Sequence, residues 1–488
     1  MIIAGLDIGT TGSKISVFNE NGLLDSFYES YPSSRNNNIQ TIDVEGIKKS
    51  VFSLTKKAID KYPQLSAIGI TSFGEAFALL DEKDNILFDC MLYTDRRGEE
   101  EAEYLINKFG NEYFKKTTGQ VVNPMFSISK ILFVKNNHPD IFNKTKKILL
   151  IEDYVVYLLS GIRQIDYSLA SRTQCFDVKQ KKWDENLLSK LDIDVNLFSK
   201  VVSTGTIAGE LKEELKDELG IKHSLLIINV AHDQIANLVG SGAIKAKSAA
   251  DGLGTCECLT PIFPKSADIN ALADYGYGMI PFLNTDEYCC YALTNTAGAL
   301  NEWVLDTYFN GPKEEKSFSF ANKLLKEEPN SLFVLPYFAG SGTPYNDKSL
   351  GTVVGLELGT KKEDIYQATI ECLCLESRLN IEFLKKAGVD IENIYASGGG
   401  SKNEMWLQIK SDVLNLPIHQ LEDENAGSVG TAIIMGVSLG IFKTYQEGID
   451  KLVKIKKTFV PHQEYVLLYE KKYQQYVKLY KALKKEGF

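Results

Sequence analysis

The sequence predicts an α/β protein built from two domains of related fold. Segments with strand and helix patterns alternate along the chain, which is typical of α/β architecture. In addition, the same opening occurs twice: a strand, a turn containing Gly and Thr, and a second strand, first at the N-terminus and again in the middle of the chain. We therefore expect domains at residues 1–243 and 244–488, with the boundary near residues 240–247.

The sequence pattern of the first opening predicts an antiparallel meander. Residues 2–7 form a short apolar run suited to a buried strand, and residues 14–18 alternate as a strand does. Residues 9–13 form a turn rich in Gly and Thr between them. Asn21-Gly22 is a strong hairpin dipeptide, because both residues accept positive φ, and residues 23–28 supply a third strand.

The second opening covers residues 249–260, with Gly254-Thr255 in its turn. Other patterned segments are expected helices at 45–62, 97–109, 233–239, 297–309, 362–387 and 403–414, and expected strands at 66–72, 225–231 and 394–396. Residues 465–487 form an amphipathic tail helix. Such a helix can bind membranes or partners, but we expect it to pack on the second domain.

Composition excludes several classes of function. The chain has 54 Lys and Arg against 64 Asp and Glu, a net charge of −10, which argues against nucleic-acid binding and against docking on an anionic membrane. No run approaches the roughly 18 apolar residues of a membrane span. The N-terminus lacks a basic region and Asp7 interrupts its apolar run, so we expect a cytoplasmic protein. The eight Cys lack zinc-site spacing, which favours buried thiols.

The first Gly/Thr turn has the residues of a phosphate-binding site. A Gly-rich turn lets backbone N–H groups approach an anion, and the hydroxyls of Thr10, Thr11 and Ser13 add donors. Lys14 adds a cation, and Asp7 could hold Mg²⁺ through water. The alternative is a plain β-hairpin. Gly254-Thr255, taken singly, is a strand connection.

A second Gly-rich loop lies between a strand and a helix, at residues 397–403. Three consecutive Gly residues cost conformational entropy, and close approach of the backbone to a ligand would explain them. Gly399, Gly400, Ser401 and Asn403 are the candidates, since the following helix N-terminus favours an anion. The alternative is a flexible connection.

One candidate base follows the buried strand at 225–231. Asp233 lies where this strand ends and a helix begins, so it is either an N-cap or a general base that takes a proton from a hydroxyl. His232 alone is an ordinary core or surface histidine and is not proposed as a metal ligand.

Together these segments resemble the FGGY carbohydrate kinases, which include ribulokinases, xylulokinases, gluconokinases and glycerol kinase. The resemblance runs in family order from residue 2 to about 440. Its motifs are residues 5–11, 153–154, 158–161, 170–173, 231–234, 254–255, 336–344, 355–356 and 397–401.

The resemblance implies two ribonuclease-H-like domains of the actin-like ATPase type around a central cleft, with ATP against the second domain and the sugar against the first. It implies Asp233 as the catalytic base and Gln234 as a sugar contact. The residues it implies for ATP and Mg²⁺ are Asp7, Thr11 and Lys14 for phosphate and metal, Gly254 and Thr255 for the second phosphate loop, and Gly399, Gly400 and Asn403 for adenosine.

The acceptor-reading residues differ from those of the better-known relatives. Xylulokinases usually read Gly-Gln-Met-His-Gly where residues 72–76 read Ser-Phe-Gly-Glu-Ala, and glycerol kinases read Asn-Gln-Arg-Glu, with Glu75 at the position of their Glu. A carboxylate at Glu75 suits vicinal hydroxyls, although a solvated loop carboxylate is the alternative. Tyr93, Asp95 and Arg97 resemble the family's Trp-x-Asp-x-Arg stretch and are expected in the same pocket.

The predicted function is ATP-dependent transfer of the γ-phosphoryl group to a small open-chain sugar, with a pentulose such as xylulose as the best single choice. A polyol kinase of the glycerol or erythritol type, or an aldonate kinase, is the alternative within the family. An actin-like ATPase and a non-catalytic sugar sensor are alternatives from other classes. The expected partners are a small sugar or polyol and, in a homodimer, a second copy of the chain.

Overall fold

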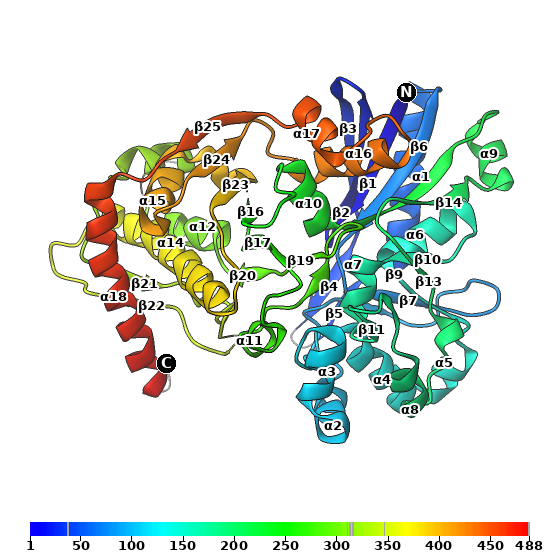
Figure 1. Cartoon of the computed structure of the whole chain (residues 1–488), viewed down its shortest axis with the longest axis horizontal. Helices are drawn as coiled ribbons and strands as arrows, with labels where there is room; N and C mark the ends of the chain where they lie inside the picture. The colour runs from blue at the N-terminus through cyan, green and yellow to red at the C-terminus, as the bar shows by residue number, and fades with distance from the viewer. Residues whose placement is uncertain (37–38, 310, 312–313, 315–316, 346, 487–488) are drawn as a thin grey trace. The chain divides into compact units, whose positions relative to one another are not determined.

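The computed structural model describes residues 1–36, 39–309, 311, 314, 317–345 and 347–486 (Figure 1). The chain forms two compact units. Unit 1 comprises Met1–Gly240, Met279–Tyr288 and Gly427–Leu452, and unit 2 comprises Ser241–Gly278, Cys289–Ala426 and the chain from Val453 onward. The chain first leaves unit 1 at Gly240, near the predicted boundary at 243/244, and two later segments return to unit 1.

Unit 1 is built on a six-stranded mixed sheet. Its order is β14 (Thr206–Glu210), β15 (Leu226–His232), β6 (Leu65–Ser72), β1 (Ile2–Ile8), β2 (Gly12–Asn19) and β3 (Gly22–Ser30). β1, β2 and β3 pair in antiparallel fashion, which confirms the predicted meander, whereas β1, β6 and β15 run parallel.

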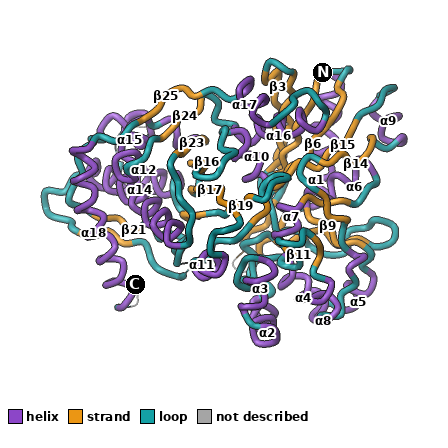
Figure 2. The backbone as a smooth tube through the Cα atoms, viewed as in Figure 1, coloured by secondary structure: helices purple, strands orange, loops and turns teal. Residues whose placement is uncertain are grey.

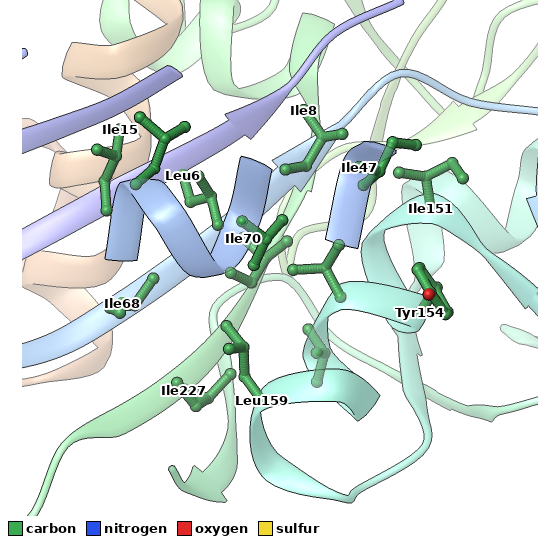
Figure 3. Close-up of a cluster of buried hydrophobic side chains, with 14 of the residues drawn as sticks. Leu6, Ile8, Ile15, Ile47, Ile68, Ile70, Ile151, Tyr154, Leu159 and Ile227 are labelled. Atoms are coloured by element: carbon green, nitrogen blue, oxygen red, sulfur yellow. The ribbon is translucent and has the colours of Figure 1, made fainter. Parts of the chain in front are cut away.

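Helices cover both faces of this sheet. Alternate residues of a strand share a face, so Leu6 and Ile8 of β1 point together toward α1 (Val44–Lys61) and α6 (Ile151–Ser160), where Ile47 and Ile151 meet them in one core (Figure 3). On the opposite face, α16 (Ala426–Ser438) lies so close that a Cβ on Gly5 would be 2.6 Å from Thr431 Cγ2.

Unit 1 also carries a group of helices apart from the sheet: α2 (Glu99–Phe109), α3 (Asn111–Thr118), α4 (Ser127–Asn137), α5 (Pro139–Lys144) and α8 (Glu185–Lys190) (Figure 2). The helix predicted at 97–109 begins at Glu99, because Gly98 adopts a left-handed φ of 99°.

The remaining elements of unit 1 are β4 (Ser33–Asn36), β5 (Ile39–Ile42), β7 (Phe77–Leu80), β8 (Cys90–Met91), β9 (Lys147–Leu150), β10 (Gln164–Asp166), α7 (Tyr167–Ala170), β11 (Phe176–Asp177), β12 (Lys182–Trp183), β13 (Lys200–Val202), α9 (Glu213–Leu219), α10 (Asp233–Gly240), β18 (Ile280–Pro281) and α17 (Tyr445–Leu452).

Unit 2 repeats the sheet of unit 1. Five of its strands lie in the order β17 (Glu257–Pro264), β16 (Ser248–Leu253), β23 (Asn393–Ser397), β24 (Ile418–Leu421) and β25 (Ile455–Phe459), and β20 (Ala292–Thr294) also pairs with β17. As in unit 1, an antiparallel hairpin, here β16 and β17, lies beside two strands that run parallel to its first strand. The shared topology confirms the prediction of two domains of related fold.

Two helices pack on strands of unit 2, α14 (Lys362–Lys386) and α15 (Glu404–Leu414). Two others pack on these helices: α12 (Gly298–Tyr308) on α14, and α18 (Gln463–Lys485) on both. The other elements of this part of the chain are β19 (Glu287–Cys289), α11 (Ile269–Asp274), α13 (Phe318–Ala321), β21 (Phe333–Leu335) and β22 (Thr352–Val354).

The predicted tail helix is α18, and it packs on α14 and α15 of its own unit (Figure 1). Tyr469, Tyr473 and Tyr480 are buried along its inner face, and Tyr476 donates to Glu376 Oε2 at 2.6 Å. This packing agrees with the prediction, and Gly487, at the end of the predicted helix, lies outside the described residues.

Two predictions from composition can be compared with the structure. Among the described residues, no helix combines the length and the apolar character needed to cross a membrane. All eight cysteines are free thiols and six of them are buried, but Cys256 is exposed and Cys258 is half-buried, because both lie at or next to the turn between β16 and β17.

Candidate functional site

In unit 1, three parallel strands end side by side and bring the predicted residues together. Asp7 on β1 lies opposite Thr71 on β6, and His232 at the end of β15 lies opposite Ser72. The carboxyl ends of parallel strands form the edge at which open α/β sheets bind ligands. Asp7 and Asp233 therefore belong to one edge of one sheet, although they are far apart in the sequence.

The first Gly/Thr turn joins β1 to β2 at this edge. The Gly9 N–H donates to the Gly12 carbonyl at 3.0 Å, and the Tyr31 hydroxyl donates to the Gly9 carbonyl, so the turn is held from inside. Thr10 is half-buried and Thr11 is exposed, whereas Ser13 is buried. The two threonines are thus accessible to an anion, and the Ser13 side chain faces the interior.

Charges around Asp7 create a site that suits a cation. The pKa of Asp7 is raised to about 6, chiefly by burial and also by the nearby carboxylate of Asp233, while Lys14 and His232 oppose the shift. A buried carboxylate with a second carboxylate nearby gains from a divalent cation, and Mg²⁺ prefers oxygen ligands. The residues present therefore fit Mg²⁺.

Asp233 begins α10 and keeps about a third of its side chain exposed, at 34%. Its Oδ1 lies 2.8 Å from Nδ1 of His232, and the main-chain N–H of His232 donates to the Ser168 hydroxyl at 2.9 Å. The Gln234 N–H donates to His232 Nδ1 at 3.2 Å. A partly exposed carboxylate is available to accept a proton, which favours a base over a simple helix cap at Asp233.

Glu75, which follows β6, is buried rather than solvated, with only 4% of its surface exposed. Its backbone has a left-handed φ of 66°, and the Ser127 hydroxyl donates to its main-chain carbonyl at 2.7 Å. Arg172 donates through Nε to Glu75 Oε1 at 2.6 Å and stacks over the ring of Phe126. The alternative of a solvated loop carboxylate is therefore wrong.

Lys130 on α4 is a charged neighbour that the sequence did not reveal. Its side chain is buried, and Nζ donates to the main-chain carbonyls of Pro124 at 2.5 Å and Met125 at 3.1 Å. Burial lowers the pKa of Lys130 to about 8, although the carboxylates of Glu75 and Asp95 act in the opposite direction. Nothing in its local sequence distinguishes this lysine from a surface lysine.

Asp95 and Arg97 form a closed pair. Arg97 donates through Nε and Nη2 to the two oxygens of Asp95 at 2.9 and 2.8 Å, and the Gln40 N–H donates at 2.7 Å. Burial raises the pKa of Asp95, but these hydrogen bonds outweigh it and hold the pKa below its usual value. Because both Asp95 oxygens are occupied, this carboxylate orients Arg97. Tyr93 is exposed by 41%.

Unit 2 contains a cavity of about 710 Å³ at the corresponding edge of its own sheet. Five of the residues predicted for ATP line it: Gly254, Thr255, Gly399, Gly400 and Asn403. Lining residues that the sequence analysis did not single out include Ala299, Asn301, Glu302, Phe318, Asn322, Tyr366, Lys402 and Trp406. Ser401 is not among the lining residues, because its hydroxyl turns inward and donates to the Gly398 carbonyl at 2.7 Å.

The three consecutive glycines have different structural reasons. A Cβ on Gly398, which has φ 84°, would lie 2.7 Å from the Leu253 carbonyl, and a Cβ on Gly400 would lie 2.9 Å from Leu253 Cβ. These two glycines let the loop pack on the end of β16. Gly399 has nothing within 4 Å of such a Cβ and faces open space. Packing thus explains the glycines at 398 and 400. Only Gly399 needs another explanation, and close approach of a ligand would supply it.

The cavity offers flat apolar surfaces and a fixed set of polar groups. Tyr366 and Asn403 both donate to Asn322 Oδ1, at 2.7 and 2.8 Å. Asn403 also caps α15 by accepting the Trp406 N–H at 3.1 Å. At the Gly254-Thr255 turn, the Gly298 N–H at the start of α12 donates to the Gly254 carbonyl at 3.0 Å. Aromatic walls with a few fixed polar groups are typical of small-molecule pockets.

Comparison with known proteins assigns both halves of the chain to one family. The model of the N-terminal domain of the FGGY family of carbohydrate kinases matches residues 2–240, and the model of its C-terminal domain matches residues 254–439. The chain belongs to the FGGY family of carbohydrate kinases. FGGY kinases transfer a phosphoryl group from ATP to an alcohol group, so the chain is a phosphotransferase.

FGGY kinases of more than one substrate class are similar to the chain. A xylulose kinase of Staphylococcus xylosus is 26% identical and covers 99% of both chains, and a glycerol kinase of Pediococcus pentosaceus is 29% identical over 82% of this chain and 79% of its own. A xylulose kinase structure from Brucella ovis has a TM-score of 0.91 at 26% identity, with 99% of each chain covered. Plasmodium falciparum glycerol kinase with ADP, at 20% identity and a TM-score of 0.88 over 100% of this chain and 98% of its own, shows the same fold.

Proposed function

We propose that this FGGY kinase transfers the γ-phosphoryl group of ATP to a hydroxyl of a small open-chain sugar, with a pentulose such as xylulose as the preferred acceptor. The observation that carries the proposal is the partly exposed carboxylate of Asp233, beside His232 and at the same sheet edge as Asp7 and the first Gly/Thr turn. Relatives named xylulose kinase that cover nearly the whole chain support the choice of acceptor.

In this proposal Asp233 is the general base. An alcohol is a poor nucleophile, and Asp233 accepts its proton as the bond between oxygen and phosphorus forms. Nδ1 of His232 lies 2.8 Å from Oδ1 of this carboxylate, so the imidazole borders the base. Gln234, the next residue of α10, supplies a polar side chain to the sugar.

Mg²⁺ and the first turn act on the phosphate chain in this scheme. Asp7 would hold the Mg²⁺, which neutralises phosphate charge that otherwise repels the nucleophile. Thr10, Thr11 and Lys14 contribute hydroxyls and a positive charge at the same turn. Because Asp7 has a pKa of about 6, it is mostly ionised and ready to bind a cation at neutral pH.

The cavity of unit 2 is the proposed nucleotide site. Its aromatic and glycine walls suit a flat base, and Asn322 and Asn403 offer hydrogen-bonding groups. Gly254 and Thr255 form its phosphate end, as the counterpart of the turn that begins at Gly9.

The charge balance around Glu75 supports a neutral acceptor. Arg172 contacts Oε1 of Glu75, which neutralises the arginine and leaves Oε2 to accept a substrate hydroxyl. An aldonate carries a carboxylate that would need an unpaired cation, whereas the hydroxyls of a ketose or a polyol need an acceptor. This balance favours a ketose or a polyol over an aldonate.

A glycerol-type polyol is the second candidate acceptor. Glu75 occupies the position at which glycerol kinases carry a Glu, and glycerol kinases are among the relatives of the chain. Position 74 distinguishes this chain from the glycerol kinases, which carry an Arg there where this chain has Gly74. A Cβ at Gly74 would lie only 2.9 Å from Arg172 Cγ. Arg172 thus occupies the space that a side chain at position 74 would need.

The test is a coupled ADP-release screen with Mg-ATP across pentuloses, hexuloses, glycerol, erythritol and aldonates. We expect the highest kcat/KM with a pentulose. A polyol that exceeds every ketose would move the assignment to the second candidate. An ATPase rate that no acceptor changes would favour an actin-like ATPase, and sugar binding without any turnover would favour a sensor, so either result would overturn the proposal.

A further inference from the structure

A buried ionic cluster lies directly behind the second phosphate turn. Lys410 of α15 donates to Asp251 Oδ2 of β16, and also to Glu257 Oε1 of β17 at 2.8 Å. Both charged pairs are cut off from solvent, since Lys410 and Asp251 have no exposed surface and Glu257 has 1%. Ser377 on α14 also donates to Glu257 Oε1.

The two carboxylates flank the turn on one face of the hairpin. Asp251 and Leu253 alternate to the same face of β16, and Leu253 lies directly opposite Glu257 in the antiparallel ladder. Asp251 precedes Gly254 by three residues, and Glu257 follows Thr255 by two. One ammonium group that bonds to both carboxylates therefore ties together the two strands from which the turn projects.

Lys410 also belongs to the helix that forms another wall of the cavity. Trp406 lies one turn earlier on the same face of α15 and lines the cavity, as does Asn403, the N-cap of this helix. The glycine loop before α15 packs on Leu253, since a Cβ on Gly400 would contact both Leu253 and Trp406. Lys410 thus connects the Gly254-Thr255 turn, through the carboxylates that flank it, to the helix that carries Trp406.

We propose that Lys410 is a positioning residue for the nucleotide: by bonding to Asp251 and Glu257 it fixes the Gly254-Thr255 turn relative to the wall formed by Asn403 and Trp406. The inference rests on the proposed role of this cavity as the nucleotide site. Lys410 does not line the cavity, so it acts through the turn and the helix. The fit between a phosphate and backbone donors is sensitive to displacements of about 1 Å.

The composition of the cluster argues for a role beyond filling the core. One ammonium faces two carboxylates, and the remaining oxygens, Asp251 Oδ1 and Glu257 Oε2, are buried without a hydrogen-bond partner among the described residues. Burial raises the pKa of Asp251 to about 7 in spite of the Lys410 charge. Apolar side chains of similar volume stabilise a core as well as or better than such ions, so a specific geometry is the property that the ions add.

The experiment compares nucleotide and acceptor kinetics in a neutral version of the cluster. Removing Lys410 alone leaves two uncompensated carboxylates and is strongly destabilising, so the main variant is the triple substitution Lys410→Met, Asp251→Asn and Glu257→Gln. We expect its KM for ATP, and its Kd for ADP measured by calorimetry, to rise about tenfold or more, while the KM for the acceptor stays within about twofold. Thermal unfolding without ligand is measured in parallel.

The matched control is the buried pair of Lys472 on α18 and Glu371 on α14 in the same unit, changed to Lys472→Met and Glu371→Gln. We expect this control to alter the unfolding temperature but not the KM for ATP. An unchanged KM for ATP and Kd for ADP in the triple variant would overturn the inference, as would an equal rise in the control. Failure of the proposed function would show separately, because the wild-type protein itself would then phosphorylate no acceptor or bind no ADP.

Discussion

The Nε–H of Arg172 donates to Oε1 of Glu75 at 2.6 Å, and this pair joins residues that are 97 positions apart in the sequence. Both side chains are buried, with 7% and 5% exposed, so each charge depends on the other for compensation. The pair lies immediately after β6, whose end carries acceptor-reading residues in FGGY kinases. It makes Glu75 the first residue to test for acceptor specificity.

Glu75→Gln should weaken the use of neutral acceptors and improve the use of acidic ones. A hydrogen bond to a charged group contributes about 1.5–3 kcal/mol, so kcat/KM for the preferred ketose should fall about tenfold to a hundredfold. The same change leaves Arg172 without its counter-ion, and the relative kcat/KM for an aldonate should rise. Glu112→Gln is the control, because that side chain is 80% exposed. An unchanged ratio of ketose to aldonate kcat/KM would refute this role of Glu75.

Asp233→Asn should abolish most of the turnover while the protein still binds ATP. The amide keeps the shape of the side chain but cannot accept the hydroxyl proton, and loss of a general base costs about 10² or more in kcat. The dissociation constant for ATP should stay within about twofold, because the proposed nucleotide cavity belongs to unit 2.

Steady-state kinetics and calorimetric ATP titration check the effect of Asp233→Asn. Asp192→Asn is the control, because it makes the same Asp-to-Asn change at a side chain that is 99% exposed. Near-normal phosphorylation by Asp233→Asn would remove Asp233 from the mechanism.

The sequence predicted the parts of this protein that depend on local signals. Short local patterns predict the hairpin at Asn21-Gly22, the turn after Asp7 and the tail helix. The structure has all three. The repeated opening also predicted the second sheet, because the Gly254-Thr255 turn joins an equivalent pair of strands.

The rest of the site depends on contacts that only the fold creates. Arg172 contacts Glu75 from a distant segment, and Lys130 is close enough for its charge to act on the same carboxylate. Lys130 looks like an ordinary charge in its own stretch of sequence, and the motif that contains Arg172 does not reveal its pairing with Glu75. Tyr366 and Trp406 line the cavity, yet their helical spacing is that of core residues. The return of α16 to unit 1 has no local signal, because an apolar helix with small residues packs equally well on either sheet.

The titration of Asp7 predicts opposite effects of pH on metal use and on stability. Burial raises its pKa from 3.8 to about 6, so protons compete with Mg²⁺ below that pH, and the Mg²⁺ concentration for half-maximal activity should rise as the pH falls from 7 to about 5.5. In the protein without ligand, the folded state binds this proton more tightly than the unfolded state. The Asp7 contribution to stability is therefore fully present below about pH 4 and is lost as the pH rises through 6.

Asp7→Asn provides the comparison for both effects, since it removes the titrating group. The variant should need much more Mg²⁺ at pH 7, and the difference in unfolding free energy between wild type and variant should change between about pH 4 and 6. Activity titrated with Mg²⁺ and urea unfolding at several pH values measure the two quantities. If wild type and variant respond to pH in parallel, Asp7 is not the titrating group.

The glycine loop before α15 allows stability and nucleotide binding to be separated at adjacent positions. Gly398→Ala forces a side chain into a left-handed φ of 84° and against the Leu253 carbonyl, so it should destabilise the protein by about 1–3 kcal/mol. Gly399→Ala meets nothing within 4 Å and should change stability by less than about 0.5 kcal/mol.

Gly399→Leu should then raise the KM for ATP several-fold without a matching loss of stability, because the larger side chain occupies the cavity that Gly399 lines. Urea unfolding and ATP kinetics on the three variants test the separation, and Gly359→Ala, at a glycine with open space around it, is the control. If Gly399→Leu leaves the KM for ATP unchanged, the nucleotide does not approach this loop and its site lies elsewhere. A rise in KM confined to Gly399→Leu would mean that Gly398 serves the packing on β16 and that Gly399 serves the ligand.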